Sequence, residues 1–187
     1  LIRNETKAAR SGRPARIMAK MNQLEDPGIM AELIEASCAG VPIQLSVRGF
    51  CCLKPGIPNL TENIRIVSIT GRFLEHSRIF HFANGEEDQL KGHWFIGSAD
   101  WMKRNLDTRV EVVTPIEDLS AKRRLKRIME VNFADRLNAW DMLSDGRYER
   151  PRVEASMEPG RPSGDGTFLT LCQDVTKIEK RARNKKQ

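Results

Sequence analysis

Histidine and cysteine, the side chains that most often carry metal or nucleophilic chemistry, are scarce in this sequence. The chain has 187 residues, of which three are histidine and four are cysteine. Cys51 and Cys52 are adjacent and no C-x-x-C pair occurs, so the spacing fits neither a zinc site nor a disulfide framework. We therefore expect reduced thiols, as in a cytosolic protein, and no metal site.

Long apolar runs and targeting segments are also absent. No stretch approaches the ~20 apolar residues of a transmembrane helix. The first residues, Leu1–Thr6, resemble neither a signal peptide nor a transit peptide. They lack an initiator methionine and already have the pattern of a helix, so we expect this chain to be a piece of a longer protein. These features predict a cytoplasmic location, with association with the inner membrane left open.

The common phosphate-binding loops are missing, although the charge favours an anionic partner. Neither G-x-x-x-x-G-K-[ST] nor G-x-G-x-x-G is present, so a nucleotide site would need another design. The composition, 40% hydrophobic and 30% charged, is that of a globular domain. The net charge of +6 favours nucleic acid, anionic lipid or polyphosphate, and its sign alone does not choose among them.

The first third of the chain predicts parallel strands. Residues 17–21 alternate as a short strand, and Asp26 followed by Pro27 is typical of a helix start. Gly40 ends that helix, and residues 41–47 alternate as a second strand. A strand, helix, strand order normally places the two strands parallel in one sheet.

Further elements extend this pattern. We expect strands at 63–69, 77–82, 94–97 and 109–113, a helix from Ser120 to Leu143, and a last short helix near Phe168–Ile178 that ends in a basic tail. The predicted fold is α/β, with a mixed β-sheet flanked by helices on both faces. Residues 1–150 would form this domain, and 151–187 a linker, a short helix and a basic tail.

His76 differs from the other two histidines in its neighbours. It forms an H-x-R unit with Arg78, and a Gly97-Ser98 unit follows after a strand, a hairpin and another strand. That hairpin can bring the two units together. An imidazole can donate, accept or carry a phosphoryl group, and a neighbouring cation can hold phosphate. The spacing alone leaves a structural role open for His76, and that role is the simpler one for His81 and His93.

Other cations lie near expected strand ends. Arg48 ends the second predicted strand, and ligands of open α/β sheets gather at the carboxyl ends of strands. A guanidinium there can bind phosphate through two hydrogen bonds, although a surface arginine fits equally well. Lys103, Arg104 and Arg109 make a second basic patch, for which a solvated loop is the alternative.

The order His76-Ser77-Arg78, then Gly97-Ser98, resembles the phospholipase D signature. Two departures stand out, because Arg78 replaces the lysine and Ala83 replaces the expected acidic residue. A fuller resemblance is to the C-terminal catalytic domain of the long bacterial polyphosphate kinases, whose catalytic domains are phospholipase-D-like. It runs from Leu1 to Leu143, and the segments that carry it are 15–22, 47–56, 71–79, 97–102 and 104–107.

The resemblance implies a kinase that transfers the terminal phosphate of ATP reversibly to inorganic polyphosphate through a phosphohistidine. That histidine would belong to the first catalytic domain, and the resemblance places it, with the N-terminal and head domains, outside this chain. The fragment alone is therefore expected to be inactive. Mg²⁺ is expected with ATP, because ATP phosphates are usually presented that way, and no obvious carboxylate pair in this chain would hold it. The family suggests a homo-oligomer, and we expect no specific nucleic acid partner.

The resemblance implies roles for two residues of this chain. Arg48 and His76 are expected to contact nucleotide phosphates, and His76 to handle a proton during transfer. Arg78, Lys103, Arg104 and Arg109 are weaker candidates for contact with the polyanion. Two alternatives remain: a phospholipase-D-like phosphodiesterase or nuclease, which the missing lysine and acidic residue disfavour, and a non-catalytic polyanion-binding module, which the charge supports.

Overall fold

The computed structural model describes residues 1–71, 73–151 and 166–184. Its strands are β1 (Ile17–Met21), β2 (Ile43–Val47), β3 (Ile64–Ile69), β4 (Arg78–Phe82), β5 (His93–Gly97), β6 (Val113–Ile116), β7 (Ala139–Met142) and β8 (Tyr148–Glu149). Its helices are α1 (Ile2–Arg10), α2 (Pro27–Cys38), α3 (Lys103–Asp107), α4 (Leu119–Ala134) and α5 (Gly166–Asn184).

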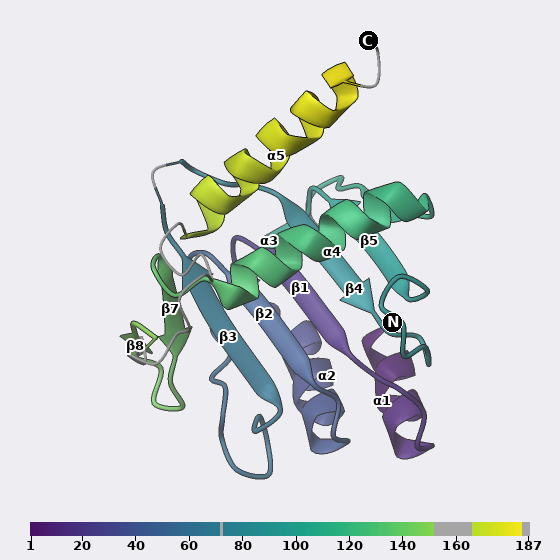
Figure 1. Cartoon of the computed structure of the whole chain (residues 1–187). Helices are drawn as coiled ribbons and strands as arrows, with labels where there is room; N and C mark the ends of the chain where they lie inside the picture. The colour runs from purple at the N-terminus through teal and green to yellow at the C-terminus, as the bar shows by residue number, and fades with distance from the viewer. Residues whose placement is uncertain (72, 152–165, 185–187) are drawn as a thin grey trace, which may run out of the picture.

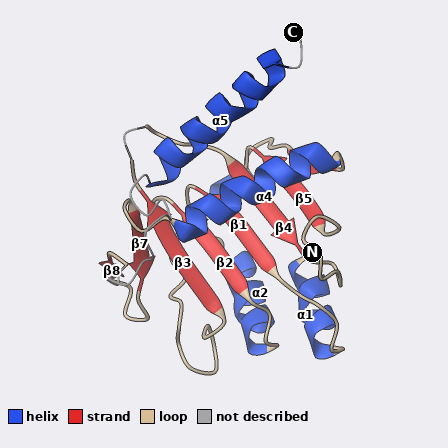
Figure 2. Cartoon of the chain, in the orientation of Figure 1, coloured by secondary structure: helices blue, strands red, loops and turns tan. Residues whose placement is uncertain are grey.

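A single mixed sheet organises the fold (Figures 1 and 2). The strands lie in the order β6-β5-β4-β1-β2-β3-β7-β8. β1, β2 and β3 are parallel, and the other neighbouring pairs are antiparallel. In Figure 1, α4 crosses the front face of the sheet, and α1 and α2 lie behind it. The predicted α/β fold with helices on both faces is confirmed.

Local signals explain the parallel centre of the sheet. The Asp26 side chain accepts a hydrogen bond from the backbone N–H of Ile29 at 2.8 Å, so it caps α2 as expected. Pro27 stands in the first turn, where its missing N–H costs no helical hydrogen bond. The crossover then returns the chain to pair β2 alongside β1 in parallel.

A hairpin joins the two predicted motif segments. Asn84 and Gly85 form a turn in the connection between β4 and β5, with φ values of 55° and 82°, a region that Asn and Gly tolerate better than other residues. β4 and β5 pair antiparallel on either side, with Arg78 opposite Gly97. The prediction that a hairpin brings the H-x-R and Gly-Ser units together is confirmed.

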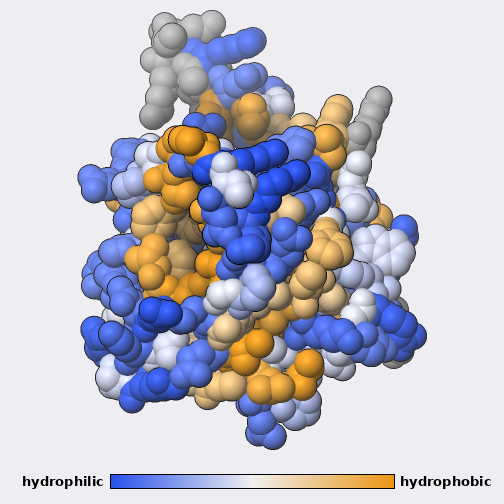
Figure 3. Space-filling view, turned by 180° about the vertical axis from the view of Figure 1, so that it is seen from behind, coloured by the Kyte–Doolittle hydropathy of each residue, from blue (hydrophilic) through white to orange (hydrophobic). Residues whose placement is uncertain are grey.

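Alternation along β1 divides the core between the two faces of the sheet. Ile17, Ala19 and Met21 pack in the cluster that contains Leu33 of α2. Met18 packs in the second cluster, with residues of α4. Seen from behind, hydrophilic surface alternates with apolar patches (Figure 3). Because side chains two apart share a face, Lys20 points to the same side as Met18, toward α4.

The predicted helix from Ser120 to Leu143 was too long. α4 ends at Ala134, because Asp135 is extended and its carboxylate accepts the backbone N–H groups of Leu137 and Asn138, both at 2.8 Å. The chain turns there, and residues 139–142 pair antiparallel with β3 as β7. Leu137 and Trp140, which fall within the range predicted for this helix, therefore lie outside it.

The predicted strand at 109–113 was also misplaced. The pairing partner of β5 is residues 113–116, with Pro115 opposite Phe95. A proline is acceptable because β6 is the edge strand and needs hydrogen bonds on one side only. Val110 and Val112, which fall within the predicted strand, are exposed.

The last helix is longer than expected, because α5 runs through part of the predicted basic tail to Asn184. Its start is tied to the end of α4. Asp135 accepts hydrogen bonds from both the backbone N–H and the hydroxyl of Thr167, each at 2.7 Å. Arg127 of α4 and Asp174 of α5 also form an ion pair at 2.8 Å. The expected linker falls on 152–165, outside the described residues.

Candidate functional site

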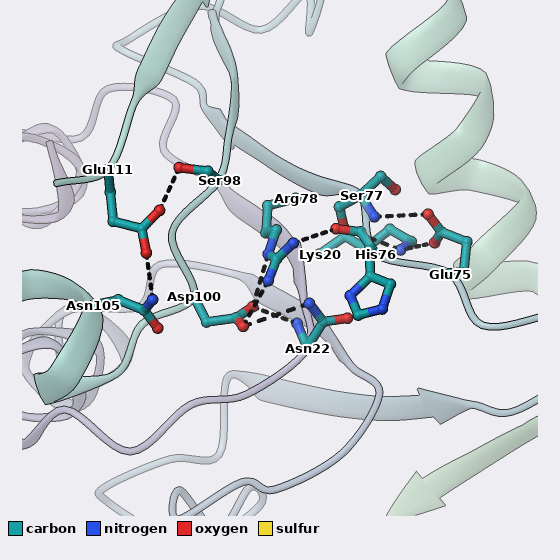
Figure 4. A network of polar contacts seen from close by, with 10 residues as sticks. All are labelled: Lys20, Asn22, Glu75, His76, Ser77, Arg78, Ser98, Asp100, Asn105 and Glu111. Atoms are coloured by element: carbon teal, nitrogen blue, oxygen red, sulfur yellow. Dashed lines mark hydrogen bonds and ion pairs between the residues drawn. The ribbon is translucent and has the colours of Figure 1, made fainter. Parts of the chain in front are cut away.

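The candidate site lies where β1 and β2 end and β4 begins (Figure 4). β4 runs antiparallel to β1, with Ile79 opposite Lys20, so the loop before β4 lies at the carboxyl end of β1. That loop carries His76. Carboxyl ends of parallel strands are where α/β domains usually place their ligands.

His76 is exposed, while the backbone around it is held by two cations. Arg78 Nη1 donates to the carbonyl oxygen of His76 at 2.7 Å. Lys20 Nζ donates to the carbonyl oxygen of Ser77 at 3.3 Å. The imidazole is therefore open to a ligand on a loop whose carbonyl groups are already bound (Figure 4).

Arg78, a predicted polyanion contact, is engaged inside the fold. Its Nε and Nη2 donate to Asp100 Oδ1 and Oδ2 at 3.1 and 3.0 Å. The backbone N–H of Asn22 donates to Asp100 at 2.7 Å. Burial opposes the ionised form of Asp100, but the bonds from Arg78 and Asn22 outweigh it and hold the pKa of this carboxyl below its usual range. Asp100 thus joins the ends of β1, β4 and β5.

Lys20 and Glu75 form a second ion pair, which the sequence did not reveal as a pair. Burial, the largest effect, lowers the pKa of the Lys20 ammonium, and repulsion from Arg48 and Arg78 adds to it against the attraction of Glu75. Burial also opposes ionisation of Glu75, but hydrogen bonds from Lys20 and Ser77 prevail and lower the pKa of its carboxyl. A single lysine in the apolar strand Ile17–Met21 was the available signal.

Arg48 follows β2, as predicted. Its backbone N–H donates to the Met21 carbonyl at 3.2 Å, and its own carbonyl accepts from the Ser68 hydroxyl at 2.7 Å. The side chain lines a cavity of about 150 Å³, shared with Lys20 and Ser77. Within the part of the chain that the structure describes, Arg48 Nη1 is buried without a hydrogen-bond partner.

Helix α5 forms the other wall of this cavity. Thr167, Phe168 and Leu171 line it opposite Arg48. The Phe168 ring lies against Gly71, where an added Cβ would come within 2.0 Å of it. Gly71 therefore allows α5 to lie close to the loop that leads to His76.

The remaining predicted cations lie apart from this cavity. Lys103, Arg104 and Arg109 are exposed, and Lys103 is paired with Asp107 on α3. The Ser98 hydroxyl donates to Glu111 and accepts the backbone N–H of Val112 at 3.1 Å. The structure thus brings Arg48 and the His76 loop together around Lys20, and leaves Lys103, Arg104 and Arg109 on the surface.

Among the described residues, no group of three or more His, Cys, Asp or Glu side chains is placed to hold a metal ion. None of the described helices combines the length and the apolar composition needed to cross a bilayer.

The fold and the site together define an α/β domain with a pocket at the carboxyl ends of its parallel strands, lined by Arg48 and by the paired Lys20 and Glu75. Residues 1–159 match the family described as polyphosphate kinase C-terminal domain 2. The chain belongs to the polyphosphate kinase family, as we expected from its motifs. It is 51% identical over 175 residues to the polyphosphate kinase of Thermosynechococcus vestitus, and this match covers 94% of the chain and 23% of that protein.

Other comparisons agree. The polyphosphate kinase of Parasynechococcus marenigrum is 53% identical over 154 residues, which cover 82% of this chain and 21% of the relative. The crystal structure of the polyphosphate kinase from Porphyromonas gingivalis superposes with a TM-score of 0.85 and 34% identity, covering 96% of this chain and 26% of that one. The chain thus spans less than a quarter of the length of these curated relatives.

Proposed function

We propose that this chain is one half of the active site of a polyphosphate kinase, which transfers the terminal phosphate of ATP reversibly to inorganic polyphosphate. The observation that carries the proposal is the unpaired, buried Nη1 of Arg48, which lines a cavity beside Lys20 and the His76 loop. A buried N–H without a partner is costly, and a phosphate oxygen would satisfy it.

The chemistry suits the side chains in this pocket. Phosphoryl transfer needs little covalent help from the protein and depends on positioning and on stabilisation of spread negative charge. Arg48 would bind a nucleotide phosphate from the end of β2. His76, exposed on its loop, would contact the transferring group and handle a proton. Lys103, Arg104 and Arg109 would guide the polyanion at the surface, and Arg78 would contribute mainly through its pair with Asp100.

The phosphohistidine belongs to the missing half of the site in this proposal. The first catalytic domain would supply it, and the N-terminal and head domains would complete a homo-oligomeric, cytoplasmic enzyme. Mg²⁺ would arrive with ATP, because ATP phosphates usually bind proteins together with this ion. Residues 1–150 would form the catalytic domain, and 151–187 a linker, helix and tail.

Transfer of labelled phosphate from ATP to polyphosphate tests the proposal. The chain is assayed alone and after mixing with the remaining domains of the kinase. We expect transfer only in the mixture, and its loss with His76→Ala. Transfer by the chain alone would place the phosphorylated residue here. Hydrolysis of a phosphodiester by the chain would instead favour the phospholipase-D-like alternative.

ATP binding gives a second test that does not need assembly of the whole enzyme. Arg48→Met should weaken binding roughly 10- to 100-fold, the usual loss when one charged hydrogen bond to a ligand is removed. Arg3→Met is the matched control, because Arg3 is an exposed arginine of α1 paired with Glu32. Equal ATP affinity in both variants would contradict the role of Arg48, and a steep salt dependence in both would indicate a general polyanion surface.

A further inference from the structure

We propose that Lys20 is a positioning residue for His76, and that it acts through Glu75 and Ser77. The inference rests on the proposed function, because it assigns to Lys20 the task of fixing the loop that presents His76. We did not name Lys20 as a candidate from the sequence, since it lies in a strand and far from His76 along the chain.

The burial of Lys20 is the first argument. Its side chain is 8% exposed, at the end of a strand whose other residues are all apolar. A buried ammonium is unfavourable unless it is paired and hydrogen-bonded. Replacing a buried ion pair by apolar residues of similar volume usually leaves the protein as stable as before. The repulsion from Arg48 and Arg78 makes the position less favourable still. Stability alone therefore does not explain a lysine here.

The contacts of Lys20 are the second argument. Its ammonium pairs with the Glu75 carboxylate and donates to the Ser77 carbonyl at 3.3 Å. Glu75 in turn accepts the backbone N–H of Ser77 at 2.8 Å. The residues on both sides of His76 are therefore bound to one buried cation (Figure 4).

Arg78 completes the support from the other strand. It donates to the His76 carbonyl at 2.7 Å while Asp100 holds its guanidinium. The peptide groups around His76 are thus fixed from β1 and from β4, and the imidazole remains free to meet a ligand. Fixed presentation matters because an error of about 1 Å in a reacting group can lower a rate roughly 100-fold.

The test is a double-mutant cycle in the full-length kinase that carries this chain, with Lys20→Met, His76→Ala and the double variant. Lys20→Met removes the charge and keeps the length of the side chain. We expect kcat to fall roughly 10- to 100-fold with KM for ATP within about twofold, since positioning of a reacting group affects the transfer step. In the His76→Ala background, the same substitution should have no further effect.

Loop mobility is measured in the same proteins, and this second readout holds even if His76→Ala leaves too little activity to measure. Hydrogen exchange of the peptide that covers residues 75–79 should accelerate in Lys20→Met and in the milder Glu75→Gln. Arg65→Met is the matched control, because it breaks the partly buried ion pair with Asp141 at a distance from the site. It should leave exchange in this peptide unchanged.

The outcomes separate the two proposals. Full activity in His76→Ala would overturn the proposed function and, with it, the role of Lys20. Loss in His76→Ala together with normal kcat and normal exchange in Lys20→Met would overturn only the positioning role. Multiplicative losses in the double variant would also overturn it, because Lys20 would then act independently of His76.

Discussion

Arg78 and Asp100 meet through two hydrogen bonds, at 3.1 and 3.0 Å, between the start of β4 and the segment that follows β5. Both side chains are largely buried, with exposed fractions of 18% and 8%. The replacement of the signature lysine by arginine is therefore accommodated by a fixed acidic partner. This pair also explains how the H-x-R and Gly-Ser units stay together in the absence of a ligand.

Breaking that pair should reduce stability strongly. Asp100→Asn leaves the Arg78 guanidinium buried without its counter-charge, and we expect the free energy of unfolding to fall by about 3 kcal/mol. Urea denaturation measures the change. Asp107→Asn is the control, because it removes an exposed pair with Lys103 and should change stability by less than about 1 kcal/mol. Equal small effects would mean that the buried pair contributes little.

A buried histidine predicts sensitivity to acid. His81 packs against Trp94 with ring centroids 4.5 Å apart, and burial, opposed by the Gln89 carbonyl, lowers the pKa of His81 to about 4. The unfolded chain, with a histidine pKa near 6.5, binds more protons between these values. The contribution of His81 to the free energy of unfolding is therefore fully present above pH 6.5. It is lost as the pH falls toward 4, by up to about 3 kcal/mol.

Urea denaturation at pH 7.5 and pH 5 measures this linkage. The loss of stability between the two pH values should shrink in His81→Phe, which keeps an aromatic ring and removes the titrating group. His93→Gln is the control, because His93 is exposed. An unchanged pH dependence in His81→Phe would assign the acid sensitivity to other groups.

The sequence predicted the elements whose signals are local. The Asp26 cap, the alternation of β1 and β2 and the Asn84-Gly85 turn each lie within a few residues, and each was found as expected. The end of α4 was missed because residues 139–142 leave the helical pattern to pair with β3, a strand far earlier in the chain. Propensity favours continuing an apolar stripe, and this tertiary contact overrides it.

Single residues of the site could be predicted from the sequence, but the contacts between them could not. Arg48 could be placed from the end of a strand, and His76 from its motif. The partnership of Lys20 with Glu75 depends on the register of β1 against β4, which pairs residues far apart in the chain. Register follows from packing of whole faces, so no local pattern specifies which residue a buried lysine will meet.

The start of α5 is attached to the end of α4 through one threonine. The Thr167 hydroxyl and backbone N–H both donate to the buried carboxylate of Asp135, at 2.7 Å each. Thr167→Val keeps the shape of the side chain and removes one bond to a charged acceptor, which should cost about 2 kcal/mol. Faster hydrogen exchange and proteolysis within α5 would report the loosening.

Thr176→Val is the matched control for that substitution. Its hydroxyl donates only within α5, to the Cys172 carbonyl at 3.0 Å, and the residue is exposed. Protection of α5 should remain as in the parent chain. If both valine variants behave alike, the Asp135 contact does not hold the helix in place.

Arg48→Met should raise the stability of the unliganded protein and weaken its binding of phosphate ligands. Its buried Nη1 has no partner among the described residues, so Arg48→Met removes an unsatisfied donor and keeps an apolar stem. We expect the unliganded protein to gain about 1 kcal/mol in the free energy of unfolding, and a higher melting temperature.

ATP or polyphosphate should raise the melting temperature of the parent chain and leave that of Arg48→Met nearly unchanged, because a ligand stabilises only the state that binds it. Arg10→Met, an exposed arginine of α1 paired with Glu35, should respond to the ligands as the parent does. If Arg48→Met is less stable than the parent and ATP still raises its melting temperature, then the guanidinium stabilises the fold and does not bind a phosphate.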